Sequence, residues 1–289
     1  MSDKAKGLSA TLIAAVYFGF VPLLMKTVYA SGGNSFTAAF LRFFFSLPLL
    51  FLYLKVNKVD LKLSKKELKQ ILIMTVFGYA GTTILIFSAY NYLPSGMATS
   101  IHFLYPTVTV VGLMVFCGEK IKPEKLICVG LCLFGIIMLY NGEEGQVSIV
   151  GILLAFASSC TYGFYTIFLG RSSIQEMEPL KRLFYMHVVG SVMMGVIGVV
   201  SGRLEFSMAP IGWGIMFLTA NLTSFIGALG YQIGVKYIGA ENAAMLSTFE
   251  PITSIIIGVI VYDEAMTLRI ALGFCAILLS TLIIARSED

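Results

Sequence analysis

Two stretches of equal length decide the fold: residues 92–119, YLPSGMATSIHFLYPTVTVVGLMVFCGE, and residues 237–264, YIGAENAAMLSTFEPITSIIIGVIVYDE. At an offset of 145, with no gap, they share a Tyr, an Ala, a Pro and a Glu, and the spacing from proline to glutamate is identical. Shared helix composition seldom reproduces such a spacing. We therefore interpret residues 146–289 as a duplicate of residues 1–145.

The composition places both halves in a membrane. Of 289 residues, 57% are hydrophobic and 12% are charged, against about 45–50% and about 25% in soluble domains. A soluble protein is therefore excluded. Apolar runs satisfy their backbone polar groups in lipid as helices, at about 20 residues per crossing. The ten expected spans are Leu8–Tyr29, Phe36–Leu54, Leu68–Tyr90, Met97–Phe116, Leu126–Tyr140, Val147–Leu169, Leu183–Val200, Ile211–Val235, Asn242–Val261 and Leu268–Ala285.

The repeat and the loop charges set the expected topology. Because each half holds five spans, an odd number, the second half enters the membrane upside down, as in many secondary transporters. With a cytoplasmic N-terminus, sixteen of the 20 Lys and Arg residues fall in inner loops, and only Arg203 and Arg269 fall in outer loops. By the positive-inside rule, we predict an all-α integral membrane protein with ten transmembrane helices in two inverted five-helix repeats. It is a multi-pass cell-membrane protein with both termini cytoplasmic, and its net charge of +4 does not indicate a nucleic-acid partner.

The paired motifs also resemble a known family. Tyr105-Pro106 with Gly118-Glu119, and Phe249-Glu250-Pro251 with Asp263-Glu264, are similar to the signature of EamA-type transporters of the drug/metabolite transporter superfamily. The resemblance covers essentially the whole chain. It implies ten spans, two repeats, and export or exchange of small metabolites, amino acids, nucleotide derivatives or drugs.

Glu250 is the only acidic residue near the centre of an expected span. A charged carboxylate there costs about 2.5–3.5 kcal/mol on insertion scales. Its functional interpretation is a proton-coupling site or a contact for a cationic substrate group, and the alternative is a protonated carboxyl that holds helices together. Ser247 lies on the same stripe as Glu250, and the repeat partners of these two residues are His102 and Tyr105.

Pro106 and Pro251 occupy equivalent positions in the two halves. Proline cannot donate to the carbonyl four residues earlier, which here belongs to His102 and Ser247 respectively. We expect a helix kink and a free carbonyl at each site, available to a substrate or to water.

Side chains that combine an apolar body with a polar group suit small organic ligands. The expected substrate-binding residues are Tyr79, Thr83, His102, Tyr105, Ser158, Tyr162, Tyr165, Asn221, Ser224, Tyr231 and Ser247; plain packing is the alternative for each. Lys26 and Arg42 lie within about two turns of the outer surface. They either reach lipid headgroups or form an outer vestibule for an anionic group. His187 is expected to be structural.

We predict a secondary transporter that moves small organic metabolites, amino-acid-like or drug-like, by alternating access, with export as the expected direction and Glu250 as the expected proton-coupling residue. A flippase for lipid-linked intermediates is the alternative, followed by a non-transporting membrane protein. An enzyme is not expected, because no catalytic motif is present. The five cysteines lie in apolar runs without a Cys-x-x-Cys pair, so no metal and no cofactor are expected. The expected partners are a small-molecule substrate and the lipid bilayer, for a monomer or homodimer.

Overall fold

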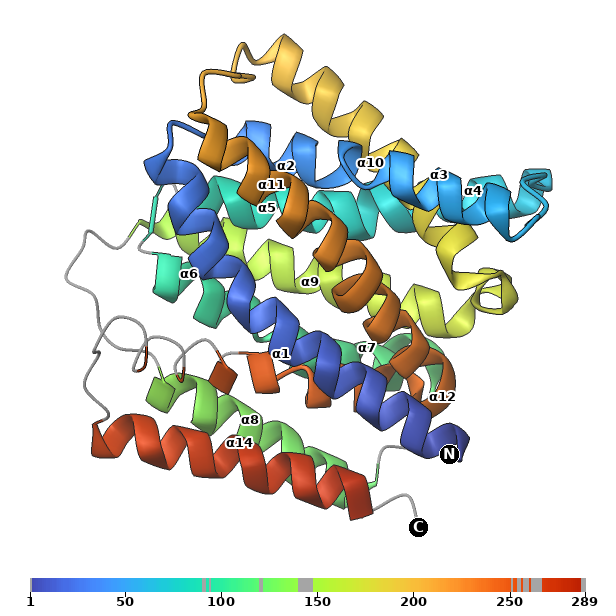
Figure 1. The fold of residues 1–289 in the computed structure, drawn as a ribbon. Coiled ribbons are helices and arrows are strands. Elements are labelled where there is room, and N and C mark those ends of the chain that lie inside the picture. Colours follow the sequence, from blue (N-terminus) through green and yellow to red (C-terminus); the bar gives the residue numbers. More distant parts are fainter. Residues whose placement is uncertain are drawn as a thin grey trace.

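The computed structural model describes residues 2–89, 92–93, 95–119, 122–139, 148–250, 252–253, 256, 260 and 267–286, and the regular secondary structure of these residues is entirely helical (Figure 1). The α-helices are α1 (Asp3–Ala30), α2 (Ser35–Phe44), α3 (Leu47–Val56), α4 (Lys65–Met74), α5 (Ala80–Ala89), α6 (Ser95–His102), α7 (Tyr105–Cys117), α8 (Pro123–Leu139), α9 (Ile149–Arg171), α10 (Pro179–Val200), α11 (Pro210–Leu222), α12 (Leu229–Leu246) and α14 (Leu268–Arg286). Two π-helical segments, η1 (Thr75–Tyr79) and η3 (Thr223–Ala228), join α4 to α5 and α11 to α12, and a 3₁₀ segment, η2 (Ser173–Glu176), follows α9.

Six helical stretches among the described residues are long and apolar enough to cross a membrane, judged by length and composition. They are Asp3–Val21, Ser35–Val56, Lys65–Ala89, Ile149–Arg171, Pro179–Val200 and Pro210–Leu246. The first three and the next two match expected spans, and the last covers the expected eighth span and the start of the ninth. The helices α8 and α14 lie where the fifth and tenth spans are expected. The all-helical, membrane-type fold is confirmed, but the count of exactly ten spans is not.

The expected fourth span, Met97–Phe116, is not one helix. It breaks after His102, and α7 starts at Tyr105 with Pro106 in its first turn. The break has a physical cause, because Pro106 lacks the N–H that would bond the His102 carbonyl. The second half breaks at the equivalent place, where Glu250 N–H donates to the Ser247 carbonyl at 2.9 Å across a turn. Pro251 itself lies outside the described residues.

A second break separates the expected eighth and ninth spans. Gly239 has φ +83° and ψ 162° inside α12, a conformation that costs glycine little and other residues much. The chain therefore reverses at this residue without a loop, so the stretch Pro210–Leu246 contains a sharp bend.

The helix α9 lies at the centre of the packing, in contact with α5, α6, α7, α12 and η1. Gly78 in η1 allows one of these close approaches, because a Cβ there would lie 2.8 Å from Cβ of Tyr165. The helices α8 and α14 pack chiefly against each other at one edge of the molecule (Figure 1).

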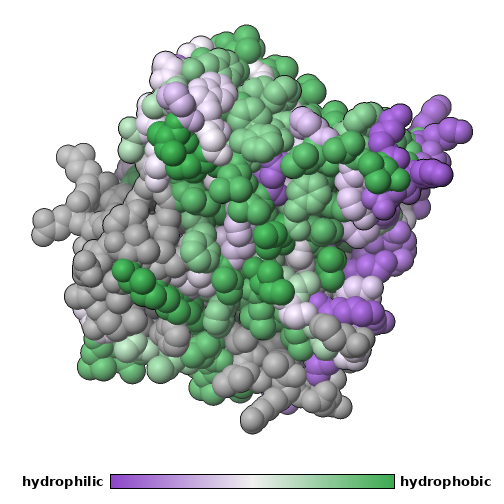
Figure 2. All heavy atoms as spheres, viewed as in Figure 1, coloured by the Kyte–Doolittle hydropathy of each residue, from purple (hydrophilic) through white to green (hydrophobic). Residues whose placement is uncertain are grey.

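One end of the molecule differs in polarity from the visible flank. Figure 2 shows hydrophilic residues gathered at the end where α3 meets α4 and where α1 begins, while the visible flank is largely hydrophobic. Figure 1 places the start of α1 and the end of α14 at this same end. We call it the lysine-rich end, because residues 55–69 bring Lys55, Lys58, Lys62, Lys65, Lys66 and Lys69 to it.

Candidate functional site

A chain of aromatic rings crosses the interior, and we call it the tyrosine cluster: Tyr79, Tyr105, Tyr162, Tyr165 and Tyr231. Ring centroids of Tyr105 and Tyr162 lie 4.6 Å apart, those of Tyr162 and Tyr231 5.7 Å, and those of Tyr79 and Tyr165 5.3 Å. The edge-on and tilted arrangements are the ones that aromatic quadrupoles favour. The cluster thus joins η1, α7, α9 and α12, which belong to both halves of the chain.

Hydrogen bonds orient most of these rings. The Tyr231 and Thr166 hydroxyls are 2.7 Å apart, and Gln232 Nε2 donates to the Tyr165 hydroxyl at 3.2 Å. His102 extends the cluster, because its ring lies 5.6 Å from that of Tyr162 and its Nδ1 is 3.0 Å from the Ser158 hydroxyl. The expected binding residues of α9, Ser158, Tyr162 and Tyr165, therefore all point inward.

Glu250 reaches the tyrosine cluster from the helical turn after Ser247. Its carboxyl interacts electrostatically with Tyr105, Tyr162 and Tyr231 and with the guanidinium of Arg42. The residue is half-buried, so part of its surface remains accessible. Within the described part of the chain, no hydrogen bond or ion pair engages the carboxyl oxygens.

Tyr105 presents a second polar atom without a partner. Its side chain is 1% exposed, and its hydroxyl makes no hydrogen bond to any described residue, although Ser247 lies beside it. The Ser247 hydroxyl instead donates to the Ala243 carbonyl at 3.0 Å. Because buried polar groups are normally hydrogen-bonded, the hydroxyl next to Glu250 is suited to meeting a ligand or water.

Arg42 is half-buried, and its side chain contacts the tyrosine cluster. Its Nη2 donates to the Tyr79 hydroxyl at 3.1 Å, its Nε is buried without a partner among the described residues, and its charge acts on Glu250. Arg42 therefore contacts the tyrosine cluster and retains at least one N–H donor that is not hydrogen-bonded to a described residue. Lys26 lies on α1, and its side chain is outside the described set.

Three other expected residues have local partners. The Thr83 hydroxyl donates to the Tyr79 carbonyl at 3.1 Å, and Asn221 Nδ2 donates to the Phe217 carbonyl at 2.8 Å. Ser224 lies 2.8 Å from Nε2 of His187, whose ring is 6.2 Å from that of Tyr79. Ser224 therefore approaches the cluster through His187. Thr83 and Asn221 each bond to the carbonyl four residues earlier in the chain.

Arg182 and Gln232 belong to the site's support, and sequence reasoning missed both. Arg182 is fully buried, with Nε donating to Gln232 Oε1 at 2.8 Å and Nη1 to the Ile174 carbonyl at 2.6 Å. Gln232 in turn donates to the Tyr165 hydroxyl, so Arg182 is linked to the tyrosine cluster through Gln232. Arg182 was one of the sixteen charges assigned to inner loops, but α10 begins three residues before it. Gln232 lies inside an apolar span, and such a polar residue was the signal that could have identified the pair.

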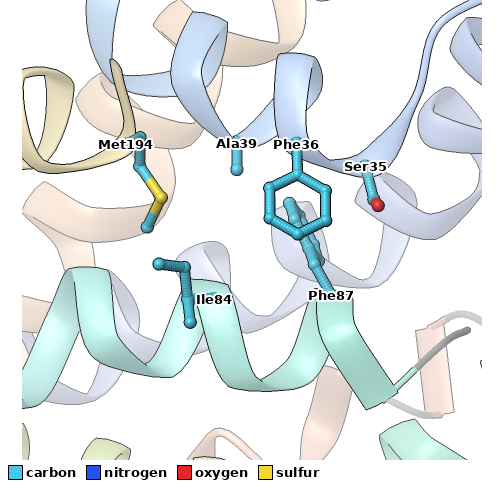
Figure 3. Close-up of a pocket in the computed structure, with 6 residues that line it drawn as sticks. All are labelled: Ser35, Phe36, Ala39, Ile84, Phe87 and Met194. Atoms are coloured by element: carbon cyan, nitrogen blue, oxygen red, sulfur yellow. The ribbon is translucent and has the colours of Figure 1, made fainter. Parts of the chain in front are cut away.

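Neither of two other features in the described part of the chain, a small pocket and a metal-binding group, forms a ligand site next to the cluster. A pocket of about 10 Å³ between α2, α5 and α10 holds at most one water and is lined by Ser35 and five apolar side chains (Figure 3). Among the described residues, no group of three His, Cys, Asp or Glu side chains is placed to hold a metal ion.

Comparison with known proteins agrees with this architecture. The EamA-like transporter family matches residues 5–141 and 149–286, one copy in each half. An uncharacterized transporter of Archaeoglobus fulgidus is 24% identical over 96% of this chain and 95% of its own, and an uncharacterized transporter of Synechocystis, sll1319, is 21% identical over 95% and 91%. The uncharacterized transporter YvbV of Bacillus subtilis is 26% identical over 66% of this chain. The matched part spans 63% of the length of YvbV.

A solved crystal structure that is 16% identical covers 99% of both chains with a TM-score of 0.85, which shows a shared fold. Together with the apolar helices, the family matches indicate a multi-pass membrane protein with a transport role. With two family repeats spanning nearly its whole length, the chain belongs to the EamA-like transporter family.

Proposed function

We propose that this protein is a secondary transporter of the cell membrane that exports small zwitterionic, amino-acid-like metabolites by alternating access. In this proposal ten spans form two inverted repeats, and both termini are cytoplasmic. The observation that carries the proposal is the presence of two opposite charges at one aromatic site: Arg42 donates a hydrogen bond to Tyr79 of the tyrosine cluster, Glu250 lies within electrostatic reach of Arg42, and the Glu250 carboxyl has no bonded partner among the described residues.

The chemistry of recognition follows from these groups. A guanidinium binds a carboxylate with charge-assisted hydrogen bonds, so Arg42 receives the acid group of the substrate. Glu250 receives its ammonium group, and the tyrosine faces attract the same cation. The apolar remainder of the substrate packs against the rings of Tyr105 and Tyr162. A multiply charged anion is disfavoured, because Glu250 repels it.

Glu250 also supplies the coupling. A lone carboxylate in a membrane interior is costly, so it is stabilised either by the substrate's ammonium group or by a proton. Binding of one excludes the other. A proton that enters from outside therefore displaces the substrate, and substrate that binds from inside displaces the proton, which gives exchange of one for the other.

Purified protein in liposomes tests this coupling. With an internal pH dye and phenylalanine as the probe, the wild type is expected to move protons when phenylalanine is added, and Glu250→Gln is expected to lose this flux. Glu124→Gln removes an exposed carboxyl at the start of α8 and serves as the matched control. Intact phenylalanine uptake in Glu250→Gln would make Glu250 a structural residue of a differently coupled carrier.

Alternating access needs a gate at each end, and two ion pairs support a closed gate at one of them. At the lysine-rich end, Glu119 pairs with Arg171, and Lys125 pairs with Glu241. Each pair joins residues of the first half to residues of the second half. At the repeat offset of 145, Glu119 and Arg171 correspond to Glu264 and Lys26, so we assign the equivalent pair, which lies outside the described contacts, to the opposite gate.

Cysteine cross-linking in a background without native cysteines tests the two gates. Glu119→Cys with Arg171→Cys is expected to cross-link and to block transport. Lys26→Cys with Glu264→Cys is expected to cross-link in the other state, so that locking one pair lowers the yield of the other. Simultaneous cross-linking of both pairs at full yield would contradict alternation between them.

A further inference from the structure

A large groove on the side of the molecule is separate from the tyrosine cluster. It encloses about 910 Å³ between α7, α8 and α9. On α7 its wall includes Val108, Val111 and Val115, and on α9 it includes Phe164 and Phe168. These spacings of three and four residues place each set on one helix face, so two parallel apolar stripes form the groove.

The contact of α7 with α9 separates this groove from the substrate site. Gly163 on α9 has no side chain, and a Cβ there would lie 2.8 Å from Val108 Cγ1. The two helices therefore pack closely at this glycine. Tyr105 and Tyr162 lie within the protein on these same helices, and the groove opens to the surface.

The length of the groove matches one leaflet of a bilayer. Along α7 its lining runs from Leu104 to Phe116, which at 1.5 Å per residue is about 18 Å. Half of the hydrocarbon core is about 15 Å. An extended acyl chain therefore fits the groove from the membrane surface to the midplane.

One end of the groove carries a positive charge. Arg171 is the charged residue in the lining, at the lysine-rich end, and its side chain is 56% exposed although it pairs with Glu119. A guanidinium has five N–H donors, so donors remain for a second anion. An apolar channel that ends at an exposed arginine complements a lipid with an anionic headgroup.

We propose that this groove is a binding site for an anionic phospholipid, whose acyl chain lies between α7 and α9 and whose phosphate contacts Arg171. The site does not depend on the proposed substrate or on proton coupling. It differs from ordinary lipid contact in having headgroup preference at one defined position.

Tryptophan quenching by brominated lipids tests the site in vesicles. Trp213 is the single tryptophan of the chain, so Trp213→Phe provides a silent background. Phe164→Trp then reports the groove, and Phe217→Trp on α11 is the control, because the two phenylalanines are 37% and 46% exposed. In mixtures of phosphatidylglycerol and phosphatidylcholine, we expect brominated phosphatidylglycerol to be preferred about tenfold at Phe164→Trp, the effect of one charge-assisted hydrogen bond, and not to be preferred at Phe217→Trp.

Substitutions at the charged end complete the test. Arg171→Gln is expected to abolish the preference at the groove, Arg171→Lys to retain most of it, and Lys122→Gln, at an exposed lysine outside the lining, to leave it unchanged. The proposal is overturned if both tryptophan positions show the same headgroup preference. It is equally overturned if the preference at Phe164→Trp survives in Arg171→Gln.

Discussion

Replacing Arg42 with glutamine is expected to weaken the binding of a zwitterion through its carboxylate alone. Arg42 is fixed against the Tyr79 hydroxyl at 3.1 Å and retains a buried Nε without a partner among the described residues. A hydrogen bond to a charged group contributes about 1.5–3 kcal/mol. Loss of one such bond corresponds to about a 10- to 150-fold increase in Kd.

Three probes that share a phenyl group isolate this contribution. Phenylalanine carries both charges, phenethylamine lacks the carboxylate, and 3-phenylpropionate lacks the ammonium group. Arg42→Gln is expected to raise the Kd of phenylalanine by the stated factor, measured by competition or calorimetry on purified protein. It is expected to leave phenethylamine binding unchanged or tighter, because a repelling cation has been removed.

Glu250→Gln gives the mirror-image expectation. It is expected to weaken phenylalanine and phenethylamine binding and to spare 3-phenylpropionate. Equal losses for all three probes in Arg42→Gln would refute the reasoning, because they would show a general collapse of the site. An unchanged Kd for phenylalanine would show that Arg42 does not meet the carboxylate.

Two further predictions concern the support of the site. Gly78→Ala is expected to lower the free energy of unfolding by about 1–3 kcal/mol, because the new Cβ would lie 2.8 Å from Tyr165. Gly214→Ala is the neutral control, because a Cβ there would have no neighbour within 4 Å. Thermal unfolding in detergent measures both variants, and equal melting temperatures would contradict the close packing at Gly78. Arg182→Met is expected to cost about 1–3 kcal/mol of stability for each polar group left without a partner, including Gln232 Oε1. In the same assay, adding Gln232→Leu to Arg182→Met is expected to recover part of this loss. If the losses of the two single variants simply add in the double variant, the two residues are not coupled.

Much of the site could be predicted because its signals are local. The stripe Ser158, Tyr162 and Tyr165 has helical spacing, and all three residues face His102 or the other tyrosines in the structure. Pro106 marks a place where a helix cannot continue unchanged, and the helix breaks there. Neither inference requires knowledge of the neighbouring helices.

The placement of the charges could not be predicted in this way. Arg42 was expected to reach lipid headgroups or to form an outer vestibule, and its contact with Tyr79, 37 residues away in the chain, was not predicted. Arg182 was counted with the loops, although it is fully buried against Gln232, 50 residues away. Charge counting gives the side of the membrane that a loop faces, and it gives no information about which neighbours a side chain meets.

The sequence by itself determined the duplication, the membrane class and the set of polar residues from which a site is drawn. Only the tertiary structure decided that Arg42 and Glu250 share one aromatic cluster, that Arg182 supports it, and that α7 and α9 form a groove on their outer face. The physical reason lies in the solvent. In water, an apolar stripe marks the buried face of a helix, but in lipid the outward faces are apolar as well, so packing between helices decides which inward side chains meet.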